Sequence, residues 1–392
     1  MIRLQYKGRI HKAKFTLRSL RYIITDQAAR RFPGLQRRWL FPTEGLPIAD
    51  AASEDLPLPS ALVEAPLPVT LQKLGISHPQ PLQLTDHIYT LIGGTFVTGW
   101  AGAMIKDGLL LTTRPQHNWV SAVRARPYRI RGLPAERPYF NLMAPIPARG
   151  HIFHWLFNSI LPLAAFLNSG KADAGLGLIV NRERSQFQQI TIAFLQARYG
   201  IAAIEPVAED EAVLVPNLQA DVPVPHIPRA LQSPLALQAL DELADFITGS
   251  EGGGPKRIYI SRNDARLRRV LNEDRILPIL EAYQFRRVLL SSLPAARQVA
   301  LFKNAEAVLA PHGAGLAHIA WCKPGARIIE FFPDPEGPRG RVKNASSDFW
   351  LISRLRGLSH FCHFGGPVES RDDGFRIAEE LLAQSLKEAG IA

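Results

Sequence analysis

The strongest constraint on this fold is a short glycine-containing turn between two buried apolar segments. Residues 307–310 are an apolar run of the kind that forms buried parallel strands. The turn follows at residues 311–316, then an apolar helix to residue 321, and then a second apolar strand, 327–332, which carries Glu330. Such a unit points helix amide groups at the carboxyl edge of a parallel sheet, where phosphate groups bind.

The residues before this turn repeat the same alternation of strand and helix. Strand 256–261 ends at Arg262, a helix is predicted over 272–283, a strand over 285–290 and a helix over 294–303. Together with the glycine turn they predict a doubly wound α/β unit whose strands are parallel. No Gly-x-Gly-x-x-Gly opens such a unit, which argues against a dinucleotide-dependent oxidoreductase.

Five short motifs occur in order along this part of the chain: Ile260-Ser261-Arg262, Arg268-Arg269-Val270-Leu271-Asn272-Glu273, Gln298, His312-Gly313-Ala314-Gly315-Leu316 and Glu330. This series resembles the pattern of glycosyltransferase family 61, over about residues 150–333. The resemblance implies a GT-B-like architecture, in which two Rossmann-like domains with parallel sheets face a cleft. It also implies a nucleotide-sugar donor bound in that cleft.

The resemblance and the distribution of prolines predict four segments. Residues 1–82 are expected to form a basic arm and a Pro-rich connector, and 83–250 the amino-terminal Rossmann-like domain on the acceptor side. Residues 251–345 are expected to form the domain that binds the nucleotide sugar. Residues 346–392 are expected to carry terminal helices that pack back on the first domain, as the resemblance implies.

The positive charge of the chain is concentrated at its start. Residues 1–40 carry eleven Lys and Arg against the single acid Asp26, which accounts for +10 of the total net charge of +11. We expect either a solvated arm or one attracted to anionic lipid, where each basic residue contributes about 1 kcal/mol. No nucleic-acid-binding module accompanies the charge, so nucleic acid is not an expected partner.

Cysteines and apolar segments bear on the compartment. Cys322 and Cys362 are too few for a disulfide framework, and no Cys/His cluster has zinc-site spacing. No stretch approaches the roughly 20 apolar residues of a membrane span, and no signal-peptide pattern is evident. We expect a cytoplasmic protein. If the basic arm binds anionic lipid, we expect this protein to attach peripherally to the inner face of the cell membrane.

Positive groups are predicted to bind the donor. Arg262, at a strand end, can present a bidentate guanidinium to phosphate oxygens, and the amides of the glycine turn can add to it. No Asp-x-Asp pair follows a strand, so we expect no metal and no cofactor. The resemblance extends the donor-binding set to Arg262, His312, Gly313, Ala314, Gly315, Leu316 and Glu330, with Glu330 contacting ribose hydroxyls from the end of its strand.

The general base is predicted to lie on a helix over 151–168. His151, His154 and Asn158 share one face of it, and an imidazole can accept a proton at neutral pH. The family pattern has an acid where this chain has Asn158, so His154 is the first candidate base and His151 the second. Supporting roles fall to Asn158, Arg268, Asn272 as a helix N-cap, Glu273 as a partner of Arg262 or Arg268, and Gln298.

The resemblance implies an inverting, metal-independent transferase of the hexosyl or pentosyl class. It would move a sugar from a nucleotide diphosphate sugar, UDP-linked by expectation, to a glycan or lipid-linked acceptor in polysaccharide biosynthesis. The alternative is a catalytically degenerate protein of the same fold that binds a nucleotide sugar but has lost its base at Asn158.

Overall fold

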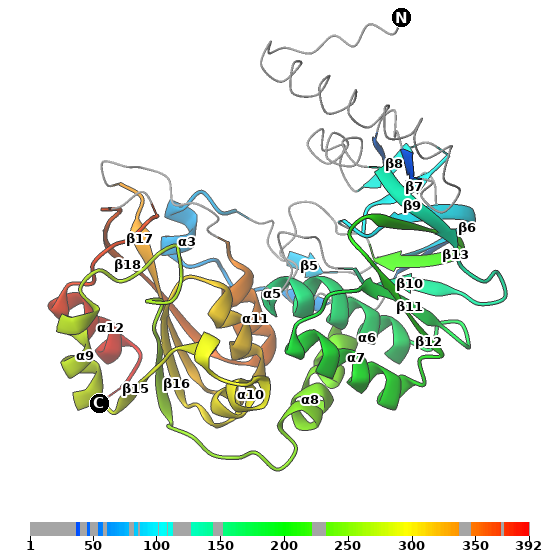
Figure 1. Ribbon diagram of the computed structural model, residues 1–392. Coiled ribbons are helices and arrows are strands. Elements are labelled where there is room, and N and C mark those ends of the chain that lie inside the picture. The colour runs from blue at the N-terminus through cyan, green and yellow to red at the C-terminus, as the bar shows by residue number, and fades with distance from the viewer. Residues whose placement is uncertain are drawn as a thin grey trace, which may run out of the picture.

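The structure is a computed structural model. It describes residues 37–39, 45–47, 54–57, 61–77, 82–84, 87–100, 102–107, 109–112, 127–143, 152–221, 233–336, 346–369 and 372–391. Figure 1 shows two lobes, each built on a sheet, with helices between them. Most of the predicted basic arm, and the candidate base His151, lie outside the described residues.

The carboxyl-terminal lobe is built on a five-stranded parallel sheet. Its strands are β14 (Arg257–Ile260), β15 (Phe285–Val288), β16 (Ala307–Pro311), β17 (Arg327–Asp334) and β18 (Ser359–Pro367). They lie in the order β15-β14-β16-β17-β18, so the strand order reverses between β14 and β16. In open α/β sheets, ligands bind at the carboxyl ends of the strands that flank this switch point. The predicted doubly wound unit is present, and it extends one strand further than the sequence indicated.

Helices cover both faces of this sheet, because successive strand residues point to opposite sides. On β17, Ile329 and Phe331 pack with α9 (Glu273–Ala282) and α12 (Glu379–Glu388). Ile328 and Phe332 belong to the core on the other face, under α10 (Ala295–Asn304), the 3₁₀ helix η5 (Ala314–Trp321) and α11 (Asp348–Arg356). Glu330 therefore faces the layer of η5 and α11.

The amino-terminal lobe carries a mixed sheet of eleven strands, not a purely parallel one. The parallel part is β12-β11-β10-β13, formed by Ala203–Val207, Gly177–Asn181, Tyr139–Asn141 and Glu211–Asp221. Antiparallel strands continue it through β6 (His87–Thr98), β7 (Met104–Lys106) and β8 (Leu109–Thr112). Short turns join β6, β7 and β8, and a short turn permits only antiparallel pairing. The remaining strands are β1 (Arg37–Trp39), β2 (Gly45–Pro47), β3 (Glu54–Pro57) and β9 (Pro127–Gly132).

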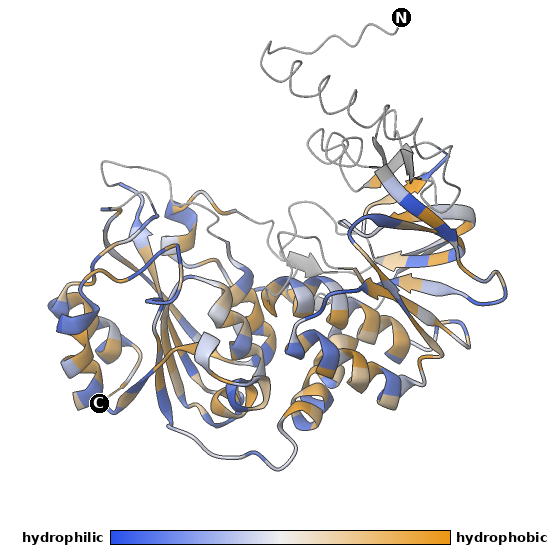
Figure 2. Cartoon of the chain, in the orientation of Figure 1, coloured by the Kyte–Doolittle hydropathy of each residue, from blue (hydrophilic) through white to orange (hydrophobic). Residues whose placement is uncertain are grey.

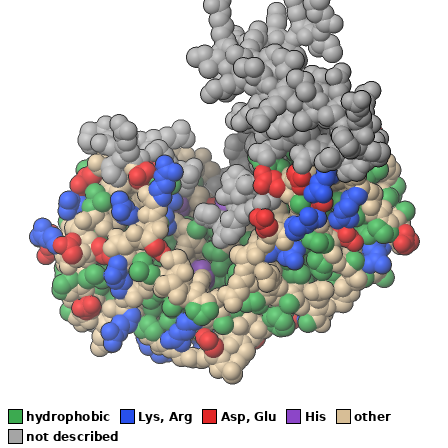
Figure 3. All heavy atoms as spheres, in the orientation of Figure 1, with side chains coloured by type: hydrophobic (Ala, Val, Ile, Leu, Met, Phe, Trp, Pro, Cys, Tyr) green, Lys and Arg blue, Asp and Glu red, His purple; other side chains and the backbone are tan. Residues whose placement is uncertain are grey.

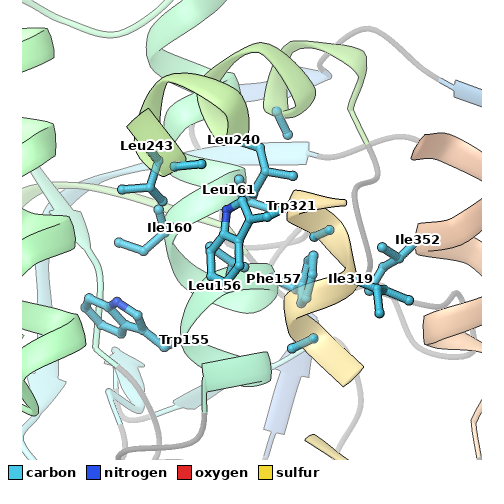
Figure 4. Close-up of a cluster of buried hydrophobic side chains, with 14 of the residues drawn as sticks. Trp155, Leu156, Phe157, Ile160, Leu161, Leu240, Leu243, Ile319, Trp321 and Ile352 are labelled. Carbon is cyan, nitrogen blue, oxygen red and sulfur yellow. The ribbon is translucent and has the colours of Figure 1, made fainter. Parts of the chain in front are cut away.

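The helices between the two sheets share a single core with both lobes. They are α5 (Ile152–Trp155), the π-helix η3 (Leu156–Ile160), α6 (Leu161–Asn168), α7 (Gln186–Tyr199) and α8 (Pro234–Thr248). Figure 4 shows Phe157 and Leu161 between α8 and η5, with Ile352 of α11 beyond. These helices carry hydrophobic residues along much of their length (Figure 2). No described helix is long and apolar enough to cross a membrane.

Two segments outside the family-like region pack on the carboxyl-terminal lobe. In α3 (Val69–Lys73), part of the predicted connector, Thr70 Oγ1 donates to the Cys362 carbonyl of β18 at 2.7 Å. The last helix, α12, packs on α9 and β18 rather than crossing to the first lobe, so the expected return of this helix is wrong. Its apolar face completes the cover of the carboxyl-terminal sheet. In contrast to α12, α11 contacts the other lobe, where Phe349 lies against Phe153 of α5.

Residues 372–377 form a strap that leads into α12. Val270 and Phe375 make a parallel bridge, and Asn272 clasps Ile377: its Oδ1 accepts from the Ile377 amide at 3.0 Å, while its Nδ2 donates to the Ile377 carbonyl at 2.9 Å. Asn272 is the residue before α9, as predicted, but its side chain makes no capping hydrogen bond. Both polar atoms of this side chain instead bind the backbone of the strap.

Asn272→Ala should destabilise the protein by about 2–4 kcal/mol. The reason is that two buried backbone groups of Ile377 lose their partners, each at a cost of about 1–3 kcal/mol. Urea denaturation measures the change. Asn304→Ala is the matched control, because Asn304 donates one hydrogen bond, from Nδ2 to the Gly254 carbonyl, at a partly buried site. Equal losses in the two variants would contradict the role of the clasp.

Candidate functional site

Arg262 and Gly313 lie in contact at the switch point of the carboxyl-terminal sheet. Arg262 follows β14 and Gly313 follows β16, and these strands are hydrogen-bonded neighbours. A Cβ placed on Gly313 would lie 1.8 Å from Nη1 and 2.6 Å from Cζ of Arg262. Gly313 has extended backbone angles, φ 167° and ψ 172°, so its glycine is explained by space rather than by conformation. The guanidinium occupies the place of the missing side chain.

The outer nitrogens of Arg262 make no direct contact with an acid among the described residues. Its Nε donates to the Leu267 carbonyl at 3.0 Å, but Nη1 and Nη2 have no hydrogen-bond or ion-pair partner within the described residues. Burial, with the like charge of Arg268 adding to it, lowers the pKa of Arg262 to about 10, so the group remains charged at neutral pH. Because a half-buried guanidinium without a partner is unfavourable, this position favours an anion.

Arg268 is the second guanidinium of the site. It is buried, its backbone is left-handed with φ 58°, and its Nε donates to the His312 carbonyl at 2.8 Å. Its amide donates to the Asp372 carbonyl of the strap at 2.8 Å. A non-glycine residue in this conformation is strained, and such strain clusters at binding sites. The predicted supporting role of Arg268 thus consists of holding the backbone just before Gly313.

Backbone amides of the turn face the same place. In the part of the chain that the structure describes, the amides of Gly313, Ala314 and Gly315 donate to no acceptor, whereas that of Leu316 donates to the Gly313 carbonyl. The helix that follows is 3₁₀ rather than the expected α-helix. Gly315 serves packing, because a Cβ there would lie 3.1 Å from Leu290 and 3.3 Å from Ile260. Unpaired amide donors beside a guanidinium are an arrangement that favours anions in proteins.

Glu330 does not contact the donor site as predicted. Strand β17 runs on to Asp334, so Glu330 lies within the strand and its side chain is 1% exposed. Oε1 lies 2.6 Å from His312 Nδ1 and Oε2 lies 3.0 Å from His360 Nε2. Burial opposes ionisation, but the charge and hydrogen bond of His312, with His360 adding to them, lower the pKa of Glu330 to about 2. Because Glu330 is buried and each of its oxygens lies beside a histidine, it supports His312 from within the sheet.

One group of side chains has metal-ligand chemistry. Glu330, His360 and Cys362 each place a ligand-type atom within 4.8 Å of the others, the one such group found among the described residues. Both oxygens of Glu330 already accept a histidine hydrogen bond. Burial, and then the charge of Glu330, raise the pKa of Cys362 well above its ordinary value, so its thiol stays protonated. The geometry is that of a completed hydrogen-bond network.

Gln298 links helix η5 to the segment that follows β15. Gln298 Nε2 donates to the carbonyls of Leu290 and Leu293, at 3.0 and 2.8 Å, and its Oε1 lies 2.8 Å from His318 Nε2 in η5. This bond fixes the middle of η5 against the segment after β15.

Glu273 was expected to hold Arg262 or Arg268. The structure instead pairs it with Arg287 at 2.9 Å and with the Nδ2 of Asn263. Asn263 directly follows Arg262, so Glu273 acts on the loop that carries Arg262 and not on its side chain.

His154 and Asn158 form a pair on the helix of the amino-terminal lobe. His154 Nδ1 lies 2.8 Å from Asn158 Oδ1, which confirms that they share a face. An amide oxygen only accepts, so Nδ1 carries the hydrogen and Nε2 the lone pair. The helix contains a π-turn over Leu156–Ile160, which ends two residues before Pro162, whose ring would clash in a regular α-helix. Asn158 Nδ2 is buried and has no partner among the described residues.

Aromatic rings join this pair to the glycine turn. Phe153 lies 5.4 Å from His154 and 5.6 Å from Phe349 between ring centroids, and Phe349 lies 5.3 Å from His312. His154 is exposed on the surface, beside elements of both lobes. Figure 3 shows the surface hollowed between the lobes, with a histidine visible in the hollow. The structure thus brings the predicted base and the predicted anion site to the same junction.

Comparisons with known proteins place a family match over most of this region. A family model described as Glycosyltransferase 61 matches residues 152–329. The chain is also 36% identical over 105 residues to the EGF domain-specific O-linked N-acetylglucosamine transferase of Drosophila melanogaster. That match covers 26% of this chain and 18% of the fly protein, so the chain spans a small part of that relative's length. The family match begins at the helix of His154 and ends one residue before Glu330.

Acid should destabilise the protein through His318. Burial lowers the pKa of His318 to about 4, against the opposing hydrogen bond of Gly315. As pH falls from about 6.5 toward 4, the unfolded chain takes up a proton that the folded chain does not, which costs up to roughly 3 kcal/mol of stability. His318→Asn removes the titration but retains a donor for Gln298. Urea denaturation at pH 7 and pH 4.5 should show a larger loss in the parent; equal losses would disprove the assignment.

Proposed function

We propose that this chain, which resembles glycosyltransferase family 61 over residues 152–329, is a glycosyltransferase that uses a nucleotide diphosphate sugar. The observation that carries the proposal is the anion site at the switch point, where the free fork of Arg262 lies against Gly313 beside three unpaired amides. A diphosphate has the charge and the number of acceptor oxygens that this site matches. The resemblance to a glycosyltransferase family is the reason to propose that this diphosphate carries a sugar.

The donor side needs stabilisation of the leaving diphosphate. Negative charge grows on its oxygens as the glycosidic bond breaks, and fixed donors aimed at that position lower the barrier. Arg262 and the amides of Gly313, Ala314 and Gly315 are such donors, and Arg268 holds the backbone that presents them. These groups support a metal-independent transfer, in which turnover persists in excess EDTA.

The acceptor side needs a base. We propose His154, oriented by the amide oxygen of Asn158 as an asparagine orients the histidine of papain-like proteases. The hydrogen bond places the lone pair on Nε2, which takes the proton of the acceptor hydroxyl. One base acting in one in-line displacement inverts the anomeric carbon. Asn158 thus replaces the acid of the family pattern as a positioning group.

The substrates and the place of action are proposed from the fly relative and from the charge distribution. The name of the fly relative makes UDP-N-acetylglucosamine the first donor to assay, among hexosyl and pentosyl donors. The acceptor is proposed to be a glycan or lipid-linked glycan. The net charge of +10 in residues 1–40 suits attachment to an anionic membrane surface. The competing function is a nucleotide-sugar-binding protein without turnover.

Arg262→Ala should weaken the binding of UDP by roughly 10- to 100-fold, the worth of one or two hydrogen bonds to a charged group. Isothermal titration calorimetry measures the affinity. Gly313→Ala should give a comparable loss while retaining the charge, because its Cβ takes the space of the Arg262 guanidinium. Arg266→Ala is the control: Arg266 lies in the same loop, 88% exposed, and pairs with Asp372. An unchanged affinity in both site variants would remove Arg262 from the site.

His154→Ala should lower kcat by roughly 10²–10⁴-fold, the usual contribution of a positioned base, and leave UDP affinity nearly unchanged. Asn158→Leu should lower kcat less, because His154 remains but loses its orienting acceptor. Asn158→Asp retains an acceptor oxygen and should preserve the rate. Steady-state kinetics with a turned-over nucleotide sugar provides the measurement. Full activity of His154→Ala would show that another group is the general base.

The same variants separate the two functions. A parent that binds UDP but turns over no nucleotide sugar, while Asn158→Glu does turn one over, would identify the natural protein as a binding protein. If the parent is active, and EDTA abolishes its activity while magnesium or manganese restores it, the protein is a transferase but its proposed metal independence is refuted.

A further inference from the structure

A buried hydrogen-bonded chain runs from α11 to the glycine turn. Ser353 Oγ lies 2.7 Å from His360 Nδ1, His360 Nε2 lies 3.0 Å from Glu330 Oε2, and Glu330 Oε1 lies 2.6 Å from His312 Nδ1. The side chains of His360, Glu330 and His312 are 1%, 1% and 3% exposed. The four residues come from α11, β18, β17 and the turn after β16.

The direction of each hydrogen bond follows from Glu330. An ionised carboxylate only accepts, so His312 donates from Nδ1 and His360 donates from Nε2. A neutral His360 then has its lone pair on Nδ1, and the Ser353 hydroxyl donates to it. Every donor in the chain therefore points toward Glu330. The other titratable groups near this carboxylate are Cys362 of β18 and Arg268, whose charge interacts with it.

The end of this chain is the residue that precedes the anion site. His312 stacks on Phe332 at 4.6 Å between ring centroids, its amide donates to the Phe331 carbonyl, and its own carbonyl accepts from Arg268. The backbone of His312 leads directly into Gly313. Its Nδ1 hydrogen is held by Glu330, so the carboxylate fixes the orientation of the ring.

We propose that His360 and Ser353 are positioning residues of the transfer reaction, which keep Glu330 ionised and thereby hold the tautomer and orientation of His312 beside the bound diphosphate. This inference rests on the proposed function, and it concerns residues beyond the segment that the family model matches. Without His360, one oxygen of a buried carboxylate lacks a partner. Glu330 then takes up a proton or turns away, and His312 loses the acceptor that orients it.

The test is proton NMR of protein carrying ¹⁵N-labelled histidine. The Nδ1 proton of His312, shielded from water and bonded to a carboxylate, should give a separate downfield signal that disappears in His312→Gln. His360→Ala should shift or remove this signal. His360→Gln, whose amide is able to donate to Glu330, should retain it. His363→Gln is the control, because His363 lies on the same strand with its ring beside Phe331 on the opposite face.

Kinetics gives the second readout. His360→Ala should lower kcat about tenfold or more through the misplacement of His312, while UDP affinity changes little, and His360→Gln should restore most of the rate. Ser353→Ala removes only the last donor and should shift the His312 signal less, so it serves if His360→Ala does not fold. A purely structural role would lower stability without moving the signal of the folded protein.

Three results would overturn the inference. One is an unchanged His312 signal in both His360→Ala and Ser353→Ala. Another is an equal change in the His363→Gln control. The third is stoichiometric zinc in the purified protein that is lost in His360→Ala, since Glu330, His360 and Cys362 would then be metal ligands. If the parent turns over no sugar, the proposed function fails, but the NMR comparison still decides the role of His360.

Discussion

The site depends on a single steric fact, namely that the Arg262 guanidinium occupies the volume that a side chain at residue 313 would fill. A glycine in extended conformation admits the guanidinium alongside the backbone of the turn, and the unpaired amides of that turn then lie beside a positive charge. The parallel sheet makes this contact possible, because β14 and β16 are neighbours that end at the same edge. Neither the charge nor the amides alone would distinguish this edge from any other strand end.

Most of the surrounding structure serves to hold these two residues. Arg268, in a left-handed conformation, ties the His312 carbonyl to the strap of residues 372–377, and the Asn272 clasp fixes the strap. On the opposite face, Gln298 anchors η5 through His318. The anion site is therefore supported from both layers of helices, by residues spread over more than a hundred positions of the chain.

The sequence was sufficient to predict the local features of this lobe and insufficient for its long-range ones. Apolar runs and glycine turns correctly predicted β14, β15, β16 and β17 and the helices α9 and α10, although the helix after β16 is 3₁₀ and not α. The i, i+4 spacing correctly placed His154 beside Asn158. The role of Glu330 was wrong because β17 continues to Asp334 and becomes paired on both sides. Strand β18 escaped prediction because its histidines and glycines lack an apolar alternation. The partners of Asn272 and Glu330 were not predictable either, since Ile377 and His360 lie far along the chain and pair through tertiary packing.

The core shared by the two lobes has a consequence for how the molecule responds as a whole. Phe157 and Leu161 of the central helices pack in one continuous cluster with Ile319 and Ile352 of the other lobe, and the Arg356–Asp241 ion pair, at 2.7 Å, joins α11 to α8 at the edge. Two lobes with a common hydrophobic core do not unfold independently, so we expect them to unfold as one cooperative unit. A ligand that binds at the turn after β16 then also stabilises helices α5 to α8. Ligand binding to one lobe therefore protects the other lobe from local opening and proteolysis.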